Sequence, residues 1–273
     1  MVFPFTFILN ASLLSKRGRS MALQNKFVVV GNKFHDYAIN DKVIIINDLL
    51  SQLKDKKTAS TLEGKFFLGQ GVNYELAEEA IFFYHLNGRD NKNLDVSNLS
   101  NAMLNKKNPR THKAKPCNII VGLVQKRDDS TYALPLLVDD NCELLQDHQT
   151  GQHIQGIMIV EAFRQSMVAV TEEFFAIDSN TKSTIVVNYI KTTYNGFLFP
   201  LPATIFLKVV EKTGTGKKIN LLVNLELWQN NILCAQCECL YVVCSANIMN
   251  RSEVRMAKIT TSEFLEEYSS SYI

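Results

Sequence analysis

GIMIVEAFRQSMVAVTEEFFAI, residues 156–177, is the stretch of sequence that decides the fold of this chain. Its apolar residues lie around almost the whole circumference of a helix, a pattern typical of a helix that is buried inside a protein. Only a few charged residues interrupt this apolar background. We therefore expect one long buried helix at 156–177, against which the rest of a domain packs.

Strand-like sequences flank this helix on both sides. They lie at Pro116–Lys126 and Tyr132–Val138 before it, and at Ser183–Tyr194, Ala203–Thr213, Lys218–Gln229 and Ile232–Cys244 after it. Gly214-Thr215-Gly216 and Asn230-Asn231 are typical of hairpin turns between antiparallel neighbours. Two strands, one helix and four meandering strands outline a hotdog fold, in which an antiparallel sheet wraps around one long buried helix.

The chain before this domain alternates short strands with helices. Strands are expected at Phe27–Gly31, Lys42–Ile46 and Lys65–Leu68, and helices at Asp48–Lys54 and Tyr74–Leu86. We assign a small α/β domain to residues 21–90, an asparagine-rich linker to 91–108, a single hotdog domain to 109–248 and a C-terminal tail to 249–273. The fold class is therefore α+β.

Residues 1–20 form a leader of uncertain origin, which carries an apolar stretch followed by basic residues. The order is the reverse of a secretory signal, and the apolar stretch is too short to span a bilayer. Two interpretations stay open. Translation could begin at Met21, directly before the first strand, or the leader could be a disordered or membrane-touching arm.

The composition argues against several classes of protein. With 29 basic and 27 acidic residues the net charge is +2, so no strong basic field favours nucleic-acid binding. Four of the six cysteines lie in one apolar strand whose alternation turns Cys234 away from Cys237 and Cys239. We therefore expect reduced thiols, no metal site and a cytoplasmic protein without a membrane span.

Two glycine-containing stretches are only superficially similar to phosphate-binding loops. Gly69-Gln70-Gly71 lacks the glycine or Lys-Thr pair that would complete such a motif, so a tight strand-to-helix turn is the simpler interpretation. The stretch Thr213–Lys218 follows Glu211, where a P-loop needs glycine, and we assign it to a hairpin. Neither predicts a nucleotide site.

Polar residues on the long helix mark the candidate site. Glu161, Arg164 and Gln165 are spaced i, i+3 and i+4, which places them on one face of the helix. Because charged side chains are almost never fully buried unless paired, a structural Glu161–Arg164 pair is one interpretation. The other is the wall of an active site, which the upstream His148 and His153 favour.

Two blocks of sequence resemble a known family. Asp147-His148-Gln-Thr-Gly-Gln-His153-Ile-Gln-Gly156, followed by Glu161-Ala-Phe-Arg164-Gln165, is similar to the signature of the A-factor biosynthesis hotdog family. The block Thr111-His112-Lys113 resembles the His-Lys segment of the same family. The two blocks occur in the order and spacing of the family, over about residues 109–245.

This resemblance implies chemistry on acyl thioesters. The best-known members of the family move a β-ketoacyl chain from acyl carrier protein onto a hydroxyl of dihydroxyacetone phosphate, towards γ-butyrolactone signals. The acyl group would therefore arrive on phosphopantetheine, as part of acyl carrier protein or CoA, and no other cofactor is implied. A small phosphorylated molecule would be the acceptor.

Roles for the residues follow from their chemistry. His153, with His148 as a weaker candidate, could act as general base on the acceptor hydroxyl. Glu161 could orient this histidine or take the proton, and amides beside Gly156 could bind the thioester oxyanion. A phosphate could be held by Arg164 or by basic residues in the preceding segment. The other substrate-binding candidates are Gln165, His112 and Lys113, and the basic residues are Lys106, Lys107, Arg110, Lys113 and Lys115.

Three functions remain open at this point: an acyltransferase, a thioesterase or hydroxyacyl-thioester dehydratase on the same scaffold, and a non-catalytic module that binds acyl groups or carrier protein. A lone hotdog domain also leaves a long edge strand uncovered. We therefore expect a homodimer that covers this edge and completes a site between subunits.

Overall fold

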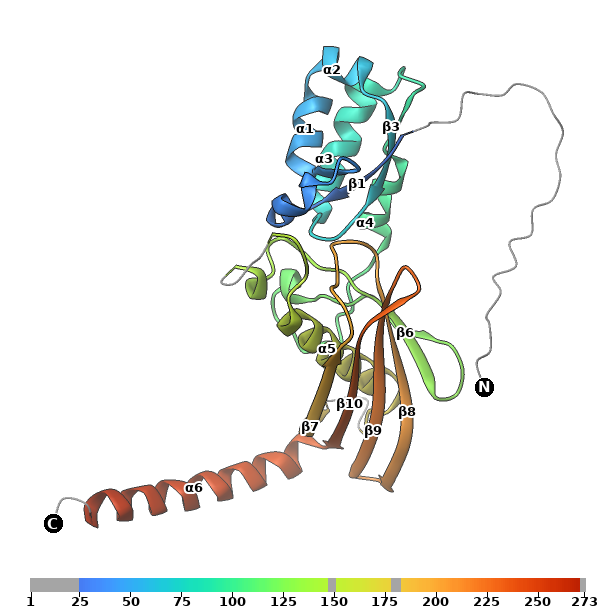
Figure 1. Cartoon of the computed structure of the whole chain (residues 1–273). Helices are drawn as coiled ribbons and strands as arrows, with labels where there is room; N and C mark the ends of the chain where they lie inside the picture. Colours follow the sequence, from blue (N-terminus) through green and yellow to red (C-terminus); the bar gives the residue numbers. More distant parts are fainter. Residues whose placement is uncertain (1–24, 147–150, 178–182, 271–273) are drawn as a thin grey trace.

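The computed structural model describes residues 25–146, 151–177 and 183–270. A small α/β unit lies at one end of a larger unit built from a curved sheet and one long helix, and a last helix projects from the far end of that sheet (Figure 1). No helix in these described ranges is long and apolar enough to cross a membrane. The leader, residues 1–20, lies outside the described residues.

The α/β unit contains a parallel sheet with helices packed against it. The strand order is β2-β1-β3-β4, formed by β1 (Lys26–Val30), β2 (Val43–Ile45), β3 (Gly64–Leu68) and β4 (Leu94–Asp95). The helices are α1 (Ile46–Lys54), α2 (Lys56–Thr61) and α3 (Tyr74–Phe83), with a 3-10 helix at Asn32–Ile39 and a π-helical turn at Tyr84–Gly88. The Asn73 side chain caps α3 by accepting a hydrogen bond from the Leu76 amide.

Residues 91–108, expected as a linker, differ from the prediction because they extend this unit. They contain β4, a 3-10 helix at Ser97–Ser100 and α4 (Asn101–Leu104). Leu94, Val96 and Leu99 are buried in the hydrophobic core of the α/β unit. These three apolar residues lie among many asparagines. The segment therefore shows neither helical nor strand periodicity, and the sequence does not predict that they are buried.

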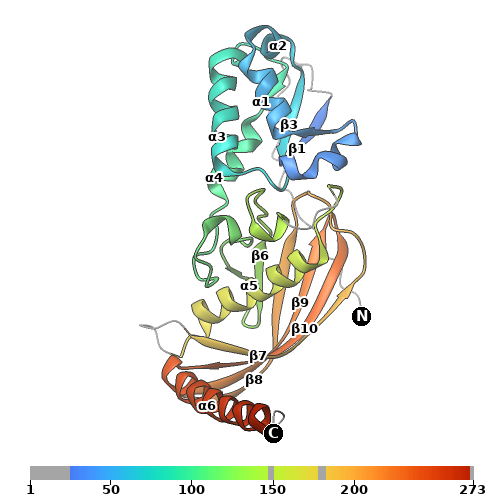
Figure 2. The same cartoon turned by 90° about the vertical axis from the view of Figure 1, so that its left-hand side faces the viewer.

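The larger unit has the predicted hotdog architecture. Helix α5 (Gly156–Phe174) packs against one face of an antiparallel sheet with the order β5-β6-β8-β9-β10-β7 (Figure 2). The strands are β5 (Gln125–Lys126), β6 (Thr131–Pro135), β7 (Thr184–Tyr194), β8 (Thr204–Thr215), β9 (Lys218–Gln229) and β10 (Ile232–Cys244). The predicted turns after β8 and β9 are confirmed, and most of the α5 residues are buried, as expected.

The first strand of this unit was predicted wrongly. Pro116–Asn118 is a 3-10 helix, Val121 forms only an isolated antiparallel bridge to Leu136, and Gln125–Lys126 pairs in the sheet as β5. Pro116 has no amide hydrogen to donate and its fixed φ favours the start of a helical turn. Further along, the Ile120 amide donates to the Gln165 side chain rather than to a neighbouring strand. The segment is therefore held both by α5 and by backbone hydrogen bonds of Ile120 and Gly122 with residues 135–137.

Two other boundaries also differ from the sequence prediction. Helix α5 ends at Phe174 instead of Ile177, with Phe175 as its C-cap. The C-terminal tail, 249–273, contributes to a 25-residue helix, α6 (Ala246–Ser270), which begins just after β10. Figures 1 and 2 show α6 leading outward past the sheet edge formed by β7.

The Gly69-Gln70-Gly71 turn joins the two units. The Gln70 side chain donates to the carbonyl oxygens of Leu136 (3.0 Å) and Leu201 (3.3 Å) and accepts from the Val138 amide (2.7 Å). Its neighbour Gly71 has φ +85° and lies against the Asp140 carboxylate, where a side chain would collide. The turn is thus a structural joint, consistent with the interpretation that it is not a phosphate loop.

Candidate functional site

The two sequence blocks of the family signature meet along α5. The segment 110–120 lies beside the polar stripe of this helix and forms ion pairs or hydrogen bonds with it at several points. The pairs are Arg110–Glu173, His112–Glu172, Lys113–Glu161 and both Asn118 and Ile120 with Gln165. Residues about 50 positions apart in sequence thereby form a row of polar and charged contacts along the helix.

Within this row, Glu161, Arg164, Gln165 and Lys113 form the Glu161 cluster. Its carboxylate accepts two hydrogen bonds from Arg164, at 2.7 and 2.8 Å, and further bonds from Lys113 Nζ (2.8 Å) and Gln165 Nε2 (2.9 Å). Burial raises the pKa of Glu161, but the hydrogen bonds from Arg164, Lys113 and Gln165 outweigh burial and lower that pKa to about 2. Near neutral pH this carboxylate is therefore an anion that holds two cations in place.

Gln165 connects the cluster to the backbone of the preceding segment. Its amide nitrogen donates to the Asn118 carbonyl at 2.8 Å, and its amide oxygen accepts from the Ile120 amide at 2.9 Å. The side chain is fully buried. Because a buried amide needs its hydrogen bonds satisfied, Gln165 fixes the segment that carries Lys113 against α5.

His112 lies beside the Glu161 cluster and contacts α5 nearer to the C-terminal end of the helix. Its Nε2 is 2.6 Å from Glu172 Oε1, and the same carboxylate oxygen accepts from the Ser183 amide at 2.8 Å. His112 has φ +57°, a left-handed conformation that is uncommon outside glycine and asparagine. The backbone turns sharply at this residue, so that His112 and Lys113 contact α5 at different turns of the helix.

The basic run that could hold a phosphate is largely engaged within the protein. Lys107 pairs with Asp139, Arg110 with Glu173, Lys113 with Glu161 and Lys115 with Glu143. Arg164 is itself paired, but it is 32% exposed and its Nη1 makes no hydrogen bond within the described residues. Arg164 therefore retains a donor for a ligand. Lys106 is also exposed and forms no ion pair among the described residues.

His153 lies in a separate pocket at the N-terminal end of α5. The pocket encloses about 400 Å³ and is lined by residues that precede and begin α5 and by residues around the end of β7, namely His153, Ile154, Gly156, Ile159, Tyr194, Asn195, Gly196, Phe197 and Leu198. The His153 ring lies 4.9 Å from the Phe197 ring, centroid to centroid. The imidazole of His153 and the ring of Phe197 thus lie side by side in the pocket at the N-terminus of α5.

The N-terminus of α5 supplies hydrogen-bond donors beside this pocket. The side chain of the N-cap residue, Gln155, makes no capping hydrogen bond, and no described residue accepts from the amides of Gly156 and Ile157. A side chain at Gly156 would crowd Tyr194, whose hydroxyl donates to the Gly156 carbonyl at 3.0 Å. Glycine thus allows the end of β7 to approach the helix start.

The structure brings some predicted residues together and separates others. Glu161, Arg164, Gln165 and Lys113 form one cluster, with His112 at its side. No hydrogen bond or ion pair joins His153 to Glu161 among the described residues, and the pocket of His153 does not include Glu161. His148 lies outside the described residues. The cluster and the pocket therefore lie at different positions along α5.

The sequence analysis missed several residues of these sites. Glu172, Asn118, Tyr194 and Phe197 reach the sites only through tertiary packing. Glu172 follows Gln165 on α5 by about two helical turns, and that spacing could have indicated it. Nothing local distinguishes Tyr194 or Phe197 from other strand and turn aromatics.

The family assignment follows from the order of these elements and from a direct match of sequence. Residues 104–245, just over half of the chain, match the model of the A-factor biosynthesis hotdog domain. The chain belongs to the A-factor biosynthesis hotdog family. Both blocks that form the Glu161 cluster lie inside the matched residues, so the cluster is part of the family domain. No curated protein matches the chain.

Solved structures that resemble this member of the family are distant in sequence. A thioesterase from Pseudomonas aeruginosa, solved as a mutant, shares 13% identity at a TM-score of 0.34, over 45% of this chain and 81% of that one. An uncharacterized protein from Pyrococcus horikoshii shares 15% identity at a TM-score of 0.34, over 50% of this chain and 92% of that one. In the described part of the chain, no three metal-binding side chains are grouped to hold an ion.

Proposed function

We propose that this hotdog protein transfers a β-ketoacyl group from a phosphopantetheine thioester, on acyl carrier protein or CoA, to a hydroxyl of a small acceptor such as dihydroxyacetone phosphate. The observation that carries the proposal is the pocket at the start of α5. It combines an imidazole, His153, with the Gly156 amide at the start of α5, which donates to no described residue, inside a domain of the A-factor family.

The proposed reaction uses these groups in turn. His153 takes the proton of the acceptor hydroxyl, and the oxygen attacks the thioester carbonyl carbon. The amides at the start of α5 stabilise the negative carbonyl oxygen that forms. The C–S bond then breaks, the ester is left on the acceptor, and the pantetheine sulfur takes the proton back from His153. Atoms and charge balance without any further reagent.

The Glu161 cluster has a supporting role in this proposal. An anion with a pKa of about 2 does not take up the hydroxyl proton near neutral pH, so Glu161 serves to hold Lys113 and Arg164. Arg164 can then offer Nη1 to a phosphate of the acceptor or of the pantetheine arm. His112 and Gln165 fix the segment that carries Lys113.

A second candidate, a non-catalytic module that binds acyl groups or carrier protein, draws on the same cluster. The Glu161 carboxylate accepts hydrogen bonds from Arg164, Lys113 and Gln165, as a purely structural carboxylate would. A hydrolase and a dehydratase share the scaffold and differ in what reacts with the thioester. Analysis of the reaction products distinguishes the acyltransferase, the hydrolase, the dehydratase and the binding module.

The test is incubation of the full chain with a β-ketoacyl thioester of CoA or carrier protein, with and without dihydroxyacetone phosphate. We expect a phosphorylated ester that requires the triose phosphate. Free acid released equally in both samples would show a thioesterase, and an enoyl product from a β-hydroxyacyl thioester would show a dehydratase. Saturable binding without any product would leave the binding module as the function.

We further propose that two copies pair along β7. This strand is the longer of the two edges of the sheet, the other being the two-residue β5, and Val186, Val187 and Tyr189 on it are 38–40% exposed. Long exposed edges with apolar residues are templates for pairing with another chain. The last residue of β7, Tyr194, lines the His153 pocket, so a second copy on β7 would lie beside that pocket and add residues to it.

Replacing Val187 with lysine should convert the dimer into monomers, because charge on an edge strand opposes pairing. Sedimentation velocity at micromolar concentration measures the change. Val210→Lys is the matched control, since Val210 is also exposed but lies on β8, away from the free edge. A monomeric wild type, or a Val187→Lys protein that remains dimeric, would contradict pairing along β7.

The free thiols fit the expected cytoplasmic location. No disulfide joins the six cysteines, and all but Cys117 are buried. Burial raises the pKa of Cys239 to about 12, so its thiol stays protonated and unreactive. We infer a reducing compartment on this ground.

A further inference from the structure

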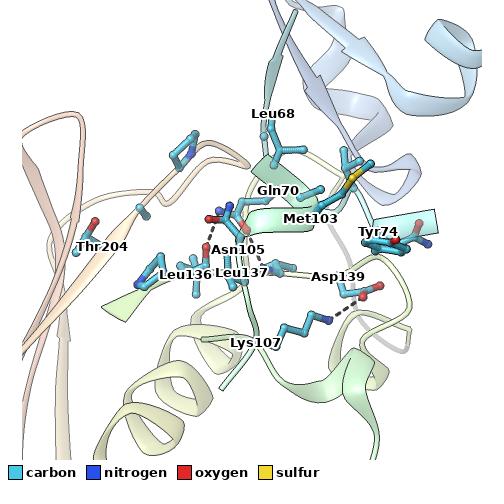
Figure 3. Close-up of a pocket in the computed structure, with 18 of the residues that line it drawn as sticks. Leu68, Gln70, Tyr74, Met103, Asn105, Lys107, Leu136, Leu137, Asp139 and Thr204 are labelled. Atoms are coloured by element: carbon cyan, nitrogen blue, oxygen red, sulfur yellow. Dashed lines mark hydrogen bonds and ion pairs between the residues drawn. The ribbon is translucent and has the colours of Figure 1, made fainter. Parts of the chain in front are cut away.

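A second and larger cleft separates the α/β unit from the outer face of the hotdog sheet. It encloses about 720 Å³ and lies at the carboxyl end of β3 and the start of α3, where open parallel sheets commonly bind ligands. In Figure 3, Leu68 and Met103 approach it from the α/β unit and Thr204 from the sheet. The His153 pocket shares no lining residue with it.

The walls of this cleft offer flat apolar surface. Phe206 and Trp228 come from the sheet face that points away from α5, and both are only half-buried. Leu68 and Met103 line the cleft from the α/β unit. Aromatic rings opposite aliphatic side chains suit a ligand that presents a flat face of C–H groups.

The rim of the cleft carries hydrogen-bonding groups that the protein leaves unused. The side chains of Asn105, Thr204, Asn230 and Asn231 line the cleft and make no hydrogen bond within the described residues. Asn73 uses its oxygen to cap α3 but keeps its amide hydrogens. Amides and a hydroxyl together both donate and accept, and this mixture matches an alcohol better than a purely accepting anion.

The charges of the cleft argue against an anionic ligand. The cation lining it, Lys107, is bound to Asp139 Oδ2 at 2.8 Å and to the Pro116 carbonyl at 3.0 Å. The pair is drawn in Figure 3. Glu75, at the start of α3, adds a further exposed carboxylate. A phosphate, and hence CoA or a sugar phosphate, would meet more negative than positive charge here.

We propose that this cleft is a binding site for an uncharged carbohydrate. A sugar ring has an apolar C–H face for Trp228 and Phe206, hydroxyl groups that both donate and accept for the asparagine amides and Thr204, and no charge to conflict with Glu75 and Asp139. The cleft has room for one or two sugar rings. This site is independent of the proposed acyl transfer at α5.

Trp228 makes the proposal directly measurable, because it is the one tryptophan of the chain. Its fluorescence is titrated with glucose, N-acetylglucosamine and maltose as neutral probes, with glucose 6-phosphate as the charged comparison and adenosine as a flat, non-carbohydrate comparison. We expect saturable change with at least one neutral sugar at millimolar concentration, and weaker binding of glucose 6-phosphate than of glucose.

Side-chain variants test whether the signal comes from this cleft. Asn231→Gly removes the amide while keeping a residue suited to the positive φ of 62° at this turn, and Thr204→Val removes the hydroxyl with little change of shape. Each should weaken binding about three- to ten-fold, the loss of one hydrogen bond. Asn247→Ala, exposed on α6, should bind as wild type does.

Three results would overturn the proposal: no fluorescence change with any neutral sugar up to tens of millimolar, saturation by adenosine alone, or glucose 6-phosphate binding more tightly than glucose. Equal loss of binding in Asn247→Ala and in the cleft variants would also overturn it. Acyl-transfer activity plays no part in this readout, so its absence would leave the sugar site unaffected.

Discussion

Replacing His153 with alanine should lower the rate of acyl transfer by about two to four orders of magnitude, the usual contribution of a general base. An acceptor hydroxyl is a weak nucleophile until its proton is removed, and His153 is the imidazole that lines the pocket at the start of α5. Single-turnover formation of the phosphorylated ester measures this rate.

The melting temperature shows whether His153→Ala acts through chemistry or through folding. His153 is only partly buried in its loop, so we expect a small change in stability. His85→Ala is the matched control, because His85 is exposed on the α/β unit and should leave the rate unchanged. A His153→Ala protein that is folded and still transfers the acyl group at the wild-type rate would exclude His153 as the base.

Replacing Glu161 with glutamine should destabilise the fold by about 3 kcal/mol at neutral pH, because the pKa shift of this carboxyl from 4.5 to about 2 corresponds to that free energy. Glutamine keeps the shape but leaves Lys113 and Arg164 without their anion. Chemical denaturation gives the free energy of unfolding. Glu173→Gln on the same helix, which breaks a more exposed pair with Arg110, should cost less than about 1 kcal/mol.

The pH dependence of this effect has a defined direction. A carboxyl whose pKa is lowered in the folded state stabilises the protein above its unfolded pKa, here 4.5, and loses that contribution as the pH falls toward 2. The difference between wild type and Glu161→Gln should therefore shrink across this acid range. Equal stability of the two proteins at neutral pH would show that the ion-pair cluster does not hold α5 to segment 110–120.

Much of the fold could be predicted because its signals are local. The apolar circumference of residues 156–174 indicates a buried helix, and the asparagine pair at 230–231 indicates a hairpin, whatever the rest of the chain does. The strand expected from Pro116 onward begins instead with a 3-10 turn at Pro116–Asn118, which the apolar residues after it did not indicate. Helix α6 was missed because its apolar residues are sparse and its surface is exposed.

The candidate site was predictable only in part. Spacing alone placed Glu161 beside Arg164 and Gln165, since i, i+3 and i+4 share a helix face. Lys113 could be associated with them only through the family resemblance, because its contact with Glu161 depends on tertiary packing. Gln70, between two glycines, gave no sign that its side chain would join the two units.

The most direct test of the central claim is a crystal structure with a thioether analogue of a β-ketoacyl-CoA, which keeps the carbonyl but cannot react. The account predicts the analogue carbonyl oxygen within about 3 Å of the Gly156 or Ile157 amide, with His153 facing the carbonyl carbon. An analogue bound instead in the cleft beside Trp228, or bound with its carbonyl away from the start of α5, would contradict acyl transfer at this site.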